Sequence, residues 1–356
     1  MTWRLLTMAA SLLVCATCVF GSSNTVVVAS WNVENLFDTE DDPANEGDDG
    51  YTPHGWSRWT PARYALKLEH LADIVFAMRP DVLCLIEVEN RRVLEDLVKT
   101  LKARHQYDLP AIMHREGDDK RGIDVALLAA KAPVATNWLS AVSGQRDVLV
   151  CDFVFEDRPL TVLVNHWKSQ LGKKEESDAI RRKEAQAVRA YIDRRLKADP
   201  AAALLVAGDF NDRPESPILT EVAGFVMDEP RVRTDPTFHF LFNLTGWLPE
   251  ETRGTYYYSP AKQWNTMDSM SVTRGLLDGG APASFWRVRR GTYRIFKTPP
   301  QCSESGAPLP FRRVRNKEVG DVYLTGYSDH FPVCLEIELR DVGAAPAAGA
   351  WGLQSE

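Results

Sequence analysis

The 356-residue chain contains little cysteine and no Cys-x-x-Cys motif, which argues against a structural zinc site. Two of the six cysteines fall in an apolar stretch at the N-terminus, and the other four allow three different disulfide pairings. These four are Cys84, Cys151, Cys302 and Cys334. Three of them stand inside apolar runs, so buried free thiols agree with the sequence at least as well as bridges do.

An excess of positive charge is also missing. The chain has 42 Lys and Arg against 49 Asp and Glu, which gives a net charge of −7. This balance excludes binding to nucleic acid through bulk positive charge. Two local basic segments remain, at residues 168–183 and 286–317, and the second also contains aromatic residues. Each could contact a polyanion, although each agrees equally well with a solvated surface.

One long apolar run is present, at residues 5–20, and it follows Arg4 and precedes the small residues Gly21, Ser22 and Ser23. This pattern predicts a signal peptide over residues 1–21, and the run is short for a membrane span. We therefore expect an exported protein, secreted or periplasmic, without a stable membrane anchor after the signal is removed. Residues 22–341 are expected to form one catalytic domain, and the tail at 342–356, rich in Ala, Gly and Pro, is expected to be flexible.

Several short apolar runs end at residues that can bind metal or phosphate. Residues 26–29 precede Asn32, 82–86 precede Glu87, 160–164 precede Asn165 and His166, and 203–207 precede Asp209 and Asn211. Runs of this kind are typical of strands buried on both faces. Helices are predicted from residue 61, through residues 93–101 and over 178–198, which indicates a layered α/β fold.

The polar groups at these strand ends suit a hard divalent cation and a phosphate. Carboxylate and carboxamide oxygens are the ligands that such cations prefer, and an imidazole such as His330 can contact phosphate. The pattern therefore predicts metal-assisted phosphoryl chemistry. The acidic loop at residues 38–49 could also hold Ca²⁺, but its spacing is not that of a helix-loop-helix calcium site, so a solvated loop is expected.

Six short motifs occur in an order that resembles the endonuclease/exonuclease/phosphatase family. They are Ser30-Trp31-Asn32, Ile86-Glu87-Val88, Val164-Asn165-His166, Gly208-Asp209-Phe210-Asn211, Met267-Asp268 and Ser328-Asp329-His330. The family includes pancreatic deoxyribonuclease, apurinic endonucleases and neutral sphingomyelinases, and local forms resemble a bacterial secreted branch. The resemblance implies a four-layer α/β/β/α sandwich, in which helices flank two packed mixed sheets.

The resemblance also implies roles for individual residues. Glu87, with the amide oxygen of Asn32 and with Asp329 nearby, would hold Mg²⁺ or Mn²⁺. Asp209 would deprotonate the attacking water, and Asn211 would hold that water or a phosphate oxygen.

Two histidines would contact the phosphate in this scheme. His330 would be oriented by Asp268, whose strand register is uncertain because Ser269-Met270-Ser271 replaces an aromatic and β-branched run. His166, beside the phosphate-binding Asn165, is the second imidazole. We also hypothesise that Asp124 orients His166.

The sequence therefore predicts an exported divalent-metal-dependent phosphodiesterase, with a nuclease acting on DNA or RNA as the leading interpretation. A sphingomyelinase-like phospholipid phosphodiesterase or a phosphomonoesterase is the alternative, and a non-catalytic binding protein is a remote one. The lipid alternative requires exposed aromatic residues. The candidates are Trp247, Tyr256, Tyr257, Tyr258 and Trp264. The sequence gives no signal of oligomeric state.

Overall fold

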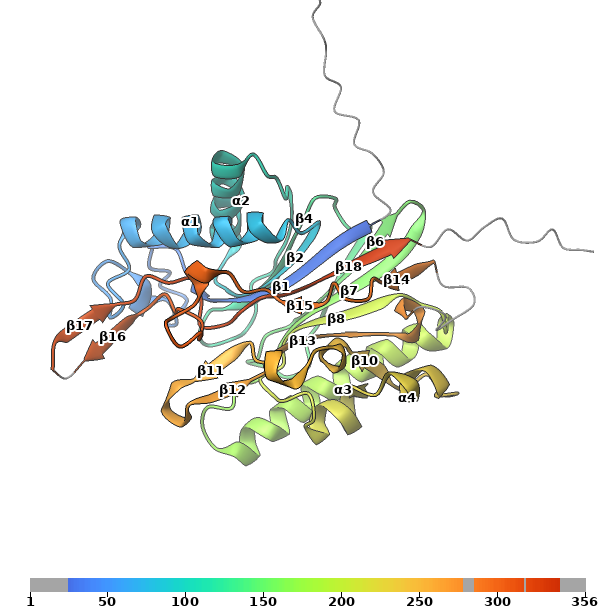
Figure 1. Ribbon diagram of the computed structural model, residues 1–356. Coiled ribbons are helices and arrows are strands. Elements are labelled where there is room, and N and C mark those ends of the chain that lie inside the picture. The colour runs from blue at the N-terminus through green and yellow to red at the C-terminus, as the bar shows by residue number, and fades with distance from the viewer. Residues whose placement is uncertain (1–24, 278–284, 317, 340–356) are drawn as a thin grey trace, which may run out of the picture.

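Two seven-stranded mixed sheets pack face to face in the computed structural model, which describes residues 25–277, 285–316 and 318–339 (Figure 1). Across the first sheet the strands are β14 (Trp286–Val288), β18 (Val333–Leu339), β1 (Thr25–Leu36), β2 (Val82–Val88), β4 (Asp124–Ala129) and β3 (Ala111–Met113), and β15 (Arg294–Ile295) also pairs with β18. Across the second they are β5 (Ala135–Leu139), β6 (Val148–Phe155), β7 (Arg158–His166), β8 (Leu204–Asp209), β13 (Asp268–Val272), β10 (Leu241–Asn243) and β9 (Phe225–Val226).

Helices cover the outer faces of both sheets and complete the predicted four layers. Helices α1 (Pro61–Met78) and α2 (Arg91–His105) pack on the first sheet, and α3 (Lys174–Ala198) packs on the second, where α4 (Glu229–Thr234) contacts β10. The layers are visible in Figure 1, with α1 and α2 above the strands and α3 and α4 below them. The predicted fold class is thus confirmed.

Local sequence signals account for the helix boundaries. The Thr60 hydroxyl accepts a hydrogen bond from the Arg63 amide and Pro61 occupies the first helical position, as expected for a capped start. Helix α3 ends at Ala198 as predicted, but it begins at Lys174, four residues before the predicted start at residue 178. Lys173 caps it without a side-chain bond, so no capping signal marked this boundary.

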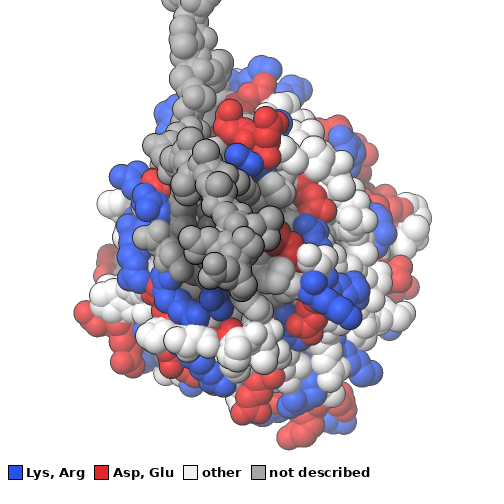
Figure 2. Space-filling model, turned by 90° about the vertical axis from the view of Figure 1, so that its right-hand side faces the viewer, with Lys and Arg blue, Asp and Glu red and all other residues white. Residues whose placement is uncertain are grey.

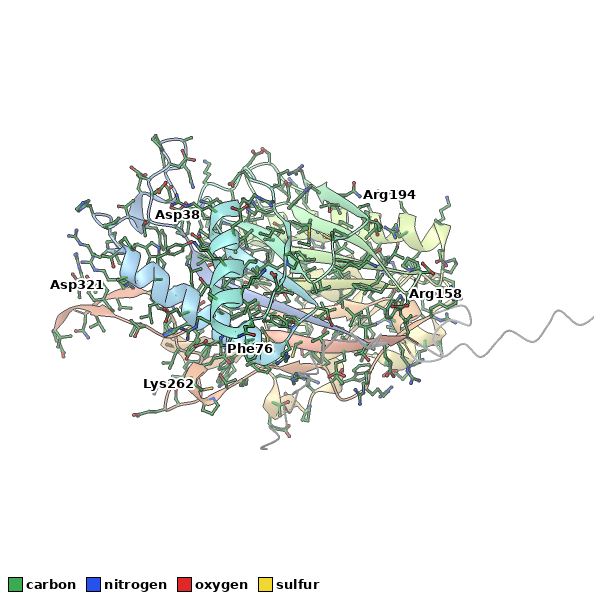
Figure 3. The ribbon with its side chains drawn as sticks, turned by 90° about the horizontal axis from the view of Figure 1, so that it is seen from above. Asp38, Phe76, Arg158, Arg194, Lys262 and Asp321 are labelled. Carbon is green, nitrogen blue, oxygen red and sulfur yellow. The ribbon has the colours of Figure 1, made fainter. Side chains whose placement is uncertain are left out.

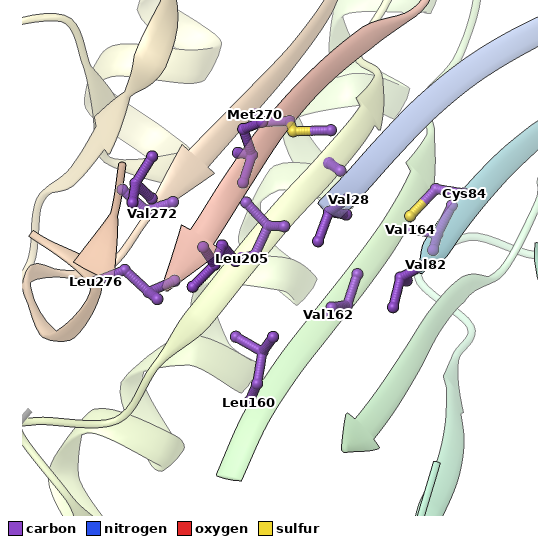
Figure 4. Packing of buried hydrophobic residues seen from close by; sticks show 14 of the residues in the cluster. Val28, Val82, Cys84, Leu160, Val162, Val164, Leu205, Met270, Val272 and Leu276 are labelled. Carbon is purple, nitrogen blue, oxygen red and sulfur yellow. The ribbon is translucent and has the colours of Figure 1, made fainter. Parts of the chain in front are cut away.

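The main core lies between the two sheets. Inward side chains of β1 and β2, such as Val28 and Cys84, face those of β7, β8 and β13, such as Val162, Leu205 and Met270 (Figure 4). One further apolar cluster joins the first sheet to its helices, and another joins the second sheet to its helices. Because most strands are covered on both faces, their sequences are almost continuously apolar. The four cysteines among the described residues are free thiols, and three of them are buried.

Shorter elements complete the described chain. Two hairpins project from the sheets, β11 (Tyr256–Tyr258) with β12 (Gln263–Asn265) and β16 (Arg313–Asn316) with β17 (Gly320–Tyr323). One-turn 3₁₀-helices occupy Asp49–Tyr51, Leu244–Trp247, Glu250–Thr252, Ser259–Ala261, Arg274–Leu276 and Pro299–Gln301, and a π-helical turn occupies Ile218–Ala223. Figure 3 shows Asp38 and Asp321 toward one end of the sandwich, and Arg158 and Arg194 toward the other.

The predicted signal peptide and the predicted flexible tail at 342–356 lie outside the described residues. Among the helices that the structure does describe, none is both long and apolar enough to cross a membrane.

Candidate active site

Four of the predicted site residues point into the space between the sheets at one rim. They are Asn32 on β1, His166 on β7, Asp209 on β8 and Asp268 on β13, and all four are buried. Each stands an even number of residues from an inward side chain of the main core, so strand alternation aims all four inward. Asp209 pairs with Asp268 on one side and with His166 on the other. The alternation thus gathers groups that are far apart in sequence.

Asp209 is held at the centre of this rim by two donors. Its Oδ2 accepts a hydrogen bond from Nδ2 of Asn32 at 3.1 Å, and its Oδ1 accepts one from the backbone amide of Asn211 at 2.8 Å. Burial and the charge of the nearby Asp268 together raise the pKa of Asp209 to about 7, against the opposing effect of His330. A carboxyl group with such a pKa can exchange a proton near neutral pH.

His330 is fixed by contacts from three directions. Its Nδ1 donates to Oδ2 of Asp268 at 2.7 Å, and its backbone carbonyl accepts from the Trp31 indole at 2.9 Å. The hydroxyl of Ser328 accepts from the His330 amide and donates to the backbone carbonyl of Asn32, which explains the serine of this motif. Burial disfavours the charged imidazole, but Asp268, with Asp209 and Asp329, outweighs it and raises the pKa of His330 well above its usual value.

Glu87 reaches the rim through an irregularity in β2. The pairing register with β4 shifts between Ile86 and Val88, and Glu87 has a φ of 66°. Ile86 faces the main core and Val88 faces the helices, so the bulge places one extra residue between the two faces. Left-handed backbone is costly for a residue with a side chain, and it occurs also at Glu34, Asn35 and Asn211 in this region. Strain of this kind concentrates at functional sites.

The oxygen atoms around Glu87 are suitable ligands for a hard divalent cation. Oε2 of Glu87 accepts from the Asn35 amide at 3.1 Å, whereas Oε1 accepts no hydrogen bond within the described part of the chain. Oδ1 of Asn32 accepts from the Glu34 amide and keeps a second lone pair, and Asp329 supplies another carboxylate beside His330. An oxygen-only set suits Mg²⁺ or Mn²⁺ better than a soft metal.

His166 lies between the two carboxylates. Its Nε2 is 3.9 Å from Oε1 of Glu87 and 3.9 Å from Oδ2 of Asp209, and its Nδ1 is buried without a hydrogen bond. Burial, together with the charge of Arg146 and other nearby cations, lowers the pKa of His166 well below its usual value. His166 and His330 are therefore opposite in character, one neutral and one cationic.

The hypothesis that Asp124 orients His166 is wrong. Asp124 stands an even number of residues from Ala126 and Leu128, whose side chains pack under the helices on the outer face of the first sheet. Its carboxylate accepts from the Gly117 amide at 3.1 Å and lies 3.7 Å from Nε2 of His114. His166 instead faces the space between the two sheets, so the two side chains do not meet.

Asn165 does not face the rim, contrary to its predicted role in binding phosphate. It is fully buried on the outer face of β7, and its Nδ2 donates to the Ala207 carbonyl at 3.2 Å. Its Oδ1 accepts from the Trp167 indole at 3.1 Å. Gly208, whose φ is 149°, permits this close packing, because a Cβ there would come within 2.0 Å of the Asn165 carbonyl oxygen. Asn165 thus holds β7 and β8 together.

Asn211 and Asp329 remain near the rim with other partners. Nδ2 of Asn211 donates to the Trp167 carbonyl at 3.0 Å, which ties the loop after β8 to the end of β7. Oδ2 of Asp329 accepts from Nη2 of Arg312 at 3.1 Å.

Sequence reasoning missed a buried charge network beside the site. Glu34 accepts from the Phe311 amide at 2.7 Å and lies 3.0 Å from Nε of Arg312. Lys67 is fully buried, and its ammonium donates to the Tyr327 carbonyl at 2.6 Å. Burial raises the pKa of Glu34 to about 7 and lowers that of Lys67 to about 8. The only sequence feature that could have indicated a role for Glu34 is its closeness to Asn32 in the chain.

Two further residues contact the predicted site. Nη2 of Arg121 lies 3.6 Å from Oε2 of Glu87 and donates to the Asn35 amide oxygen at 2.6 Å. The ring of Tyr256, on β11, lies 4.9 Å from the His330 ring. Neither position follows from a strand-end pattern, because both residues belong to segments that return to the rim from outside the main sheets.

A cavity of about 250 Å³ opens beside Glu34 and Asn35. Aromatic and basic side chains dominate its walls. They are Tyr51, Trp56, Trp59, Phe311, Arg63, Arg312 and Arg313. Nε and Nη2 of Arg63 are buried without hydrogen-bond partners, and the guanidinium lies over the rings of Trp59 and Tyr323.

The acidic loop forms a compact group of its own. Carboxylates of Asp41, Asp48 and Asp49 lie within 4.8 Å of one another, and Oδ2 of Asp48 accepts from the Asp42 amide at 2.9 Å. A cation in this loop stays a prediction, since exposed carboxylates gather in this way without one.

The family model described as the Endonuclease/Exonuclease/phosphatase family matches residues 27–339. The chain belongs to this family. Its members are phosphoric-ester hydrolases that use divalent metal ions. Comparison with curated protein sequences gives no match.

Solved structures support the same fold at low sequence identity. A humanized TDP2 of D. rerio is 15% identical with a TM-score of 0.52, and the match covers 89% of this chain and 100% of that one. D. rerio TDP2 complexed with single strand DNA product is 16% identical with a TM-score of 0.51, covering 88% and 99%. SmcL is 16% identical with a TM-score of 0.51, and the match covers 88% of this chain and 99% of that one. At these identities the likeness concerns the fold alone.

Proposed function

We propose that the protein is an exported, divalent-metal-dependent phosphodiesterase that hydrolyses DNA or RNA by in-line attack of an activated water. The observation that carries this proposal is the placement of Asp209. Its carboxylate is buried, fixed by Asn32 and Asn211, and flanked by a neutral and a cationic imidazole. Such a group can take a proton from water while its neighbours bind the phosphate.

The remaining residues have complementary tasks in this mechanism. Asp268 holds the His330 ring so that Nε2 can donate to a phosphate oxygen, and the raised pKa keeps that ring charged as negative charge develops. Neutral His166 donates from Nε2, and Asn211 helps to place the water. A Mg²⁺ or Mn²⁺ ion held by Glu87, Asn32 and Asp329 would supply positive charge to the phosphate oxygens.

The cavity beside Glu34 supports a nucleic-acid substrate. Trp56, which is 57% exposed, can stack on a base, and the partly exposed guanidinium of Arg312 can pair with a phosphate, so this part of the lining suits a single-stranded or frayed polynucleotide. Figure 2 shows the other end of the sandwich, where β1 begins. On the part of this face that is not grey, acidic and basic side chains are interspersed. Substrate contact is therefore assigned to the catalytic end rather than to this face.

A phospholipid phosphodiesterase is the second candidate because the β11–β12 hairpin exposes aromatic rings near His330. Tyr258 is 47% exposed and Trp264 is 36% exposed, whereas Trp247, Tyr256 and Tyr257 are half-buried. Two exposed rings are a small area for membrane contact, so this candidate ranks behind the nuclease.

Hydrolysis of supercoiled plasmid DNA by the purified protein tests the leading proposal. We expect nicking that requires Mg²⁺ or Mn²⁺, stops with chelator, and is lost in Asp209→Asn but kept in the matched control Asp212→Asn, whose carboxylate pairs with Arg181 instead. Absence of nicking, with activity on sphingomyelin vesicles or a phosphomonoester, would replace the nuclease with the corresponding alternative. Absence of all three activities, with intact folding, would favour a binding protein.

The proposed export has a separate test. Expression of the full sequence in a Gram-negative bacterium should give a protein in the periplasm or medium whose N-terminus, read by mass spectrometry, begins after Gly21. A cytoplasmic protein that keeps residues 1–21 would contradict export without affecting the proposed chemistry.

A further inference from the structure

A second group of metal-binding side chains lies away from the catalytic rim, on the outer face of the first sheet. His114 follows β3, Asp124 begins β4, and Glu116 lies in the segment between them. One ligand atom from each residue lies within 4.8 Å of the other two. Nδ1 of His114 is 3.8 Å from Oε1 of Glu116, and Nε2 is 3.7 Å from Oδ2 of Asp124. The three side chains therefore face one another.

The imidazole of His114 is buried but has no partner for one of its nitrogens. Its side chain is 2% exposed, and Nε2 forms no hydrogen bond. Buried polar atoms in folded proteins almost always have a partner, so an exception calls for a ligand or a water. Because Nε2 faces the Asp124 carboxylate, a cation between the two groups would satisfy both.

The two carboxylates also lack positive partners. Within the described segments, neither Glu116 nor Asp124 forms an ion pair with a lysine or an arginine. Among the described residues, only the Gly117 amide donates a hydrogen bond to the Asp124 carboxylate. A Cβ at Gly117 would come within 2.5 Å of Oδ1 of Asp124. Glycine at this position lets the loop close over the carboxylate. The result is a group of two carboxyl side chains and one imidazole nitrogen without a hydrogen-bond partner.

We propose that His114, Glu116 and Asp124 bind a second divalent cation of the transition-metal class, such as Zn²⁺, distinct from the ion expected at Glu87. An imidazole nitrogen combined with carboxylate oxygens suits zinc, whereas magnesium and calcium prefer oxygen alone. Three protein ligands leave a fourth position for water, a frequent arrangement for zinc.

The position of this site gives the cation a structural consequence. Residues 114–124 form a segment that reaches both sides of the catalytic centre. Arg121 contacts Asn35 and Glu87, and Asp119 accepts from Arg146 at 2.7 Å. Arg146 in turn donates to the backbone carbonyl of Trp167 at the end of β7. A cation bound at the two ends of the segment would therefore brace the loop that contacts the catalytic rim.

Calorimetric titration of the purified protein with Zn²⁺, in excess Mg²⁺, tests the site. The wild type should bind one Zn²⁺, and Glu116→Gln should weaken this binding by at least about tenfold. Glu116 is 68% exposed in its side chain and accepts no hydrogen bond, so its replacement leaves folding intact. Asp118→Asn removes a charge from the same loop and should change nothing, and Glu87→Gln should retain the Zn²⁺ site.

Three outcomes would overturn the proposal. They are no Zn²⁺ binding in excess Mg²⁺, equal binding by Glu116→Gln and wild type, or loss of binding in Glu87→Gln. Limited trypsin digestion supplies a readout that is independent of catalysis, because Lys120 and Arg121 are exposed in the braced loop. Zn²⁺ should slow cleavage after these residues in the wild type but not in Glu116→Gln. Equal rates with and without Zn²⁺ would contradict the bracing role.

Discussion

Nδ1 of His330 lies 2.7 Å from Oδ2 of Asp268, although 62 positions separate the two residues in the chain. Asp268 begins β13 and pairs directly with Asp209, so the same strand register that places the proposed base also places the carboxylate behind the imidazole. The register of β13, which its unusual Ser-Met-Ser sequence left uncertain, is therefore settled by pairing with β8 over five residues.

Asp268→Asn should change the pH dependence of catalysis. The Asp268 charge raises the pKa of His330, so its removal lowers that pKa and the imidazolium is lost at lower pH. We expect kcat/KM to fall by about 10²–10⁴-fold and its alkaline limb to move toward lower pH. A pH–rate profile of both proteins checks this shift. A uniform loss of rate with an unmoved alkaline limb would mean that Asp268 only supports the fold.

Substitutions at the adjacent positions Asn165 and His166 should have opposite effects. Asn165→Ala removes buried hydrogen bonds to Ala207 and Trp167 and should lower the free energy of unfolding by about 1–3 kcal/mol, with a small effect on kcat/KM. His166→Gln should lower kcat/KM by about 10²-fold or more with a small change in stability, because its ring makes no hydrogen bond from Nδ1. Urea unfolding and steady-state kinetics distinguish the two, and a kinetic defect in folded Asn165→Ala would restore its phosphate-binding role.

Lys67→Met should destabilise the protein strongly. The ammonium of Lys67 is fully buried near Glu34, and its removal leaves that carboxylate with less compensating charge. Removing one charge from a buried group of opposite charges costs up to about 3–5 kcal/mol. Lys99→Met, at an exposed position of α2, is the matched control and should stay within about 0.5 kcal/mol of the wild type in urea unfolding. Equal stability of the two variants would show that the Lys67 charge does not stabilise the Glu34 carboxylate.

Glu184→Gln should flatten the dependence of stability on pH. Burial raises the pKa of Glu184 from 4.5 to about 7, so the folded state holds the proton more tightly than the unfolded state. This contribution to stability is complete below about pH 4.5 and is lost as the pH rises to about 7. Between these limits the free energy of unfolding of the variant should fall by up to about 3 kcal/mol less than that of the wild type. Parallel curves for both proteins in thermal or urea unfolding from pH 5 to pH 8 would contradict this.

The sequence predicted the strands and the rim better than the direction of each side chain. Strand-end patterns identified Asn32, Glu87 and Asp209 because polar groups after apolar runs stand out, and the motif at residues 328–330 identified His330. The faces of β7 and β4 were not readable, since strands buried on both sides are apolar at every position. Asn165 and Asp124 were therefore assigned inward when both point outward.

Other parts of the site depend on tertiary contacts that leave no local signal. The bulge at Glu87 follows from pairing with both neighbouring strands rather than from a glycine or proline in β2. Lys67 lies in the helix that was predicted from residue 61, yet its charge is buried because Glu34 and the Tyr327 carbonyl come from distant segments. Pairings of this range cannot be read from spacing alone.

Strand β1 pairs with β18 over six residues, and the motifs at their ends supply Asn32 and His330 to the same rim. The first and last strands of the described chain are thus both needed to build it. A chain that ends before residue 328, whether unfinished or cleaved, lacks His330 and cannot form the proposed centre. If the proposed hydrolase is indeed exported, the cell that makes it is protected from its activity until translation is complete, without a separate inhibitor for the unfinished chain.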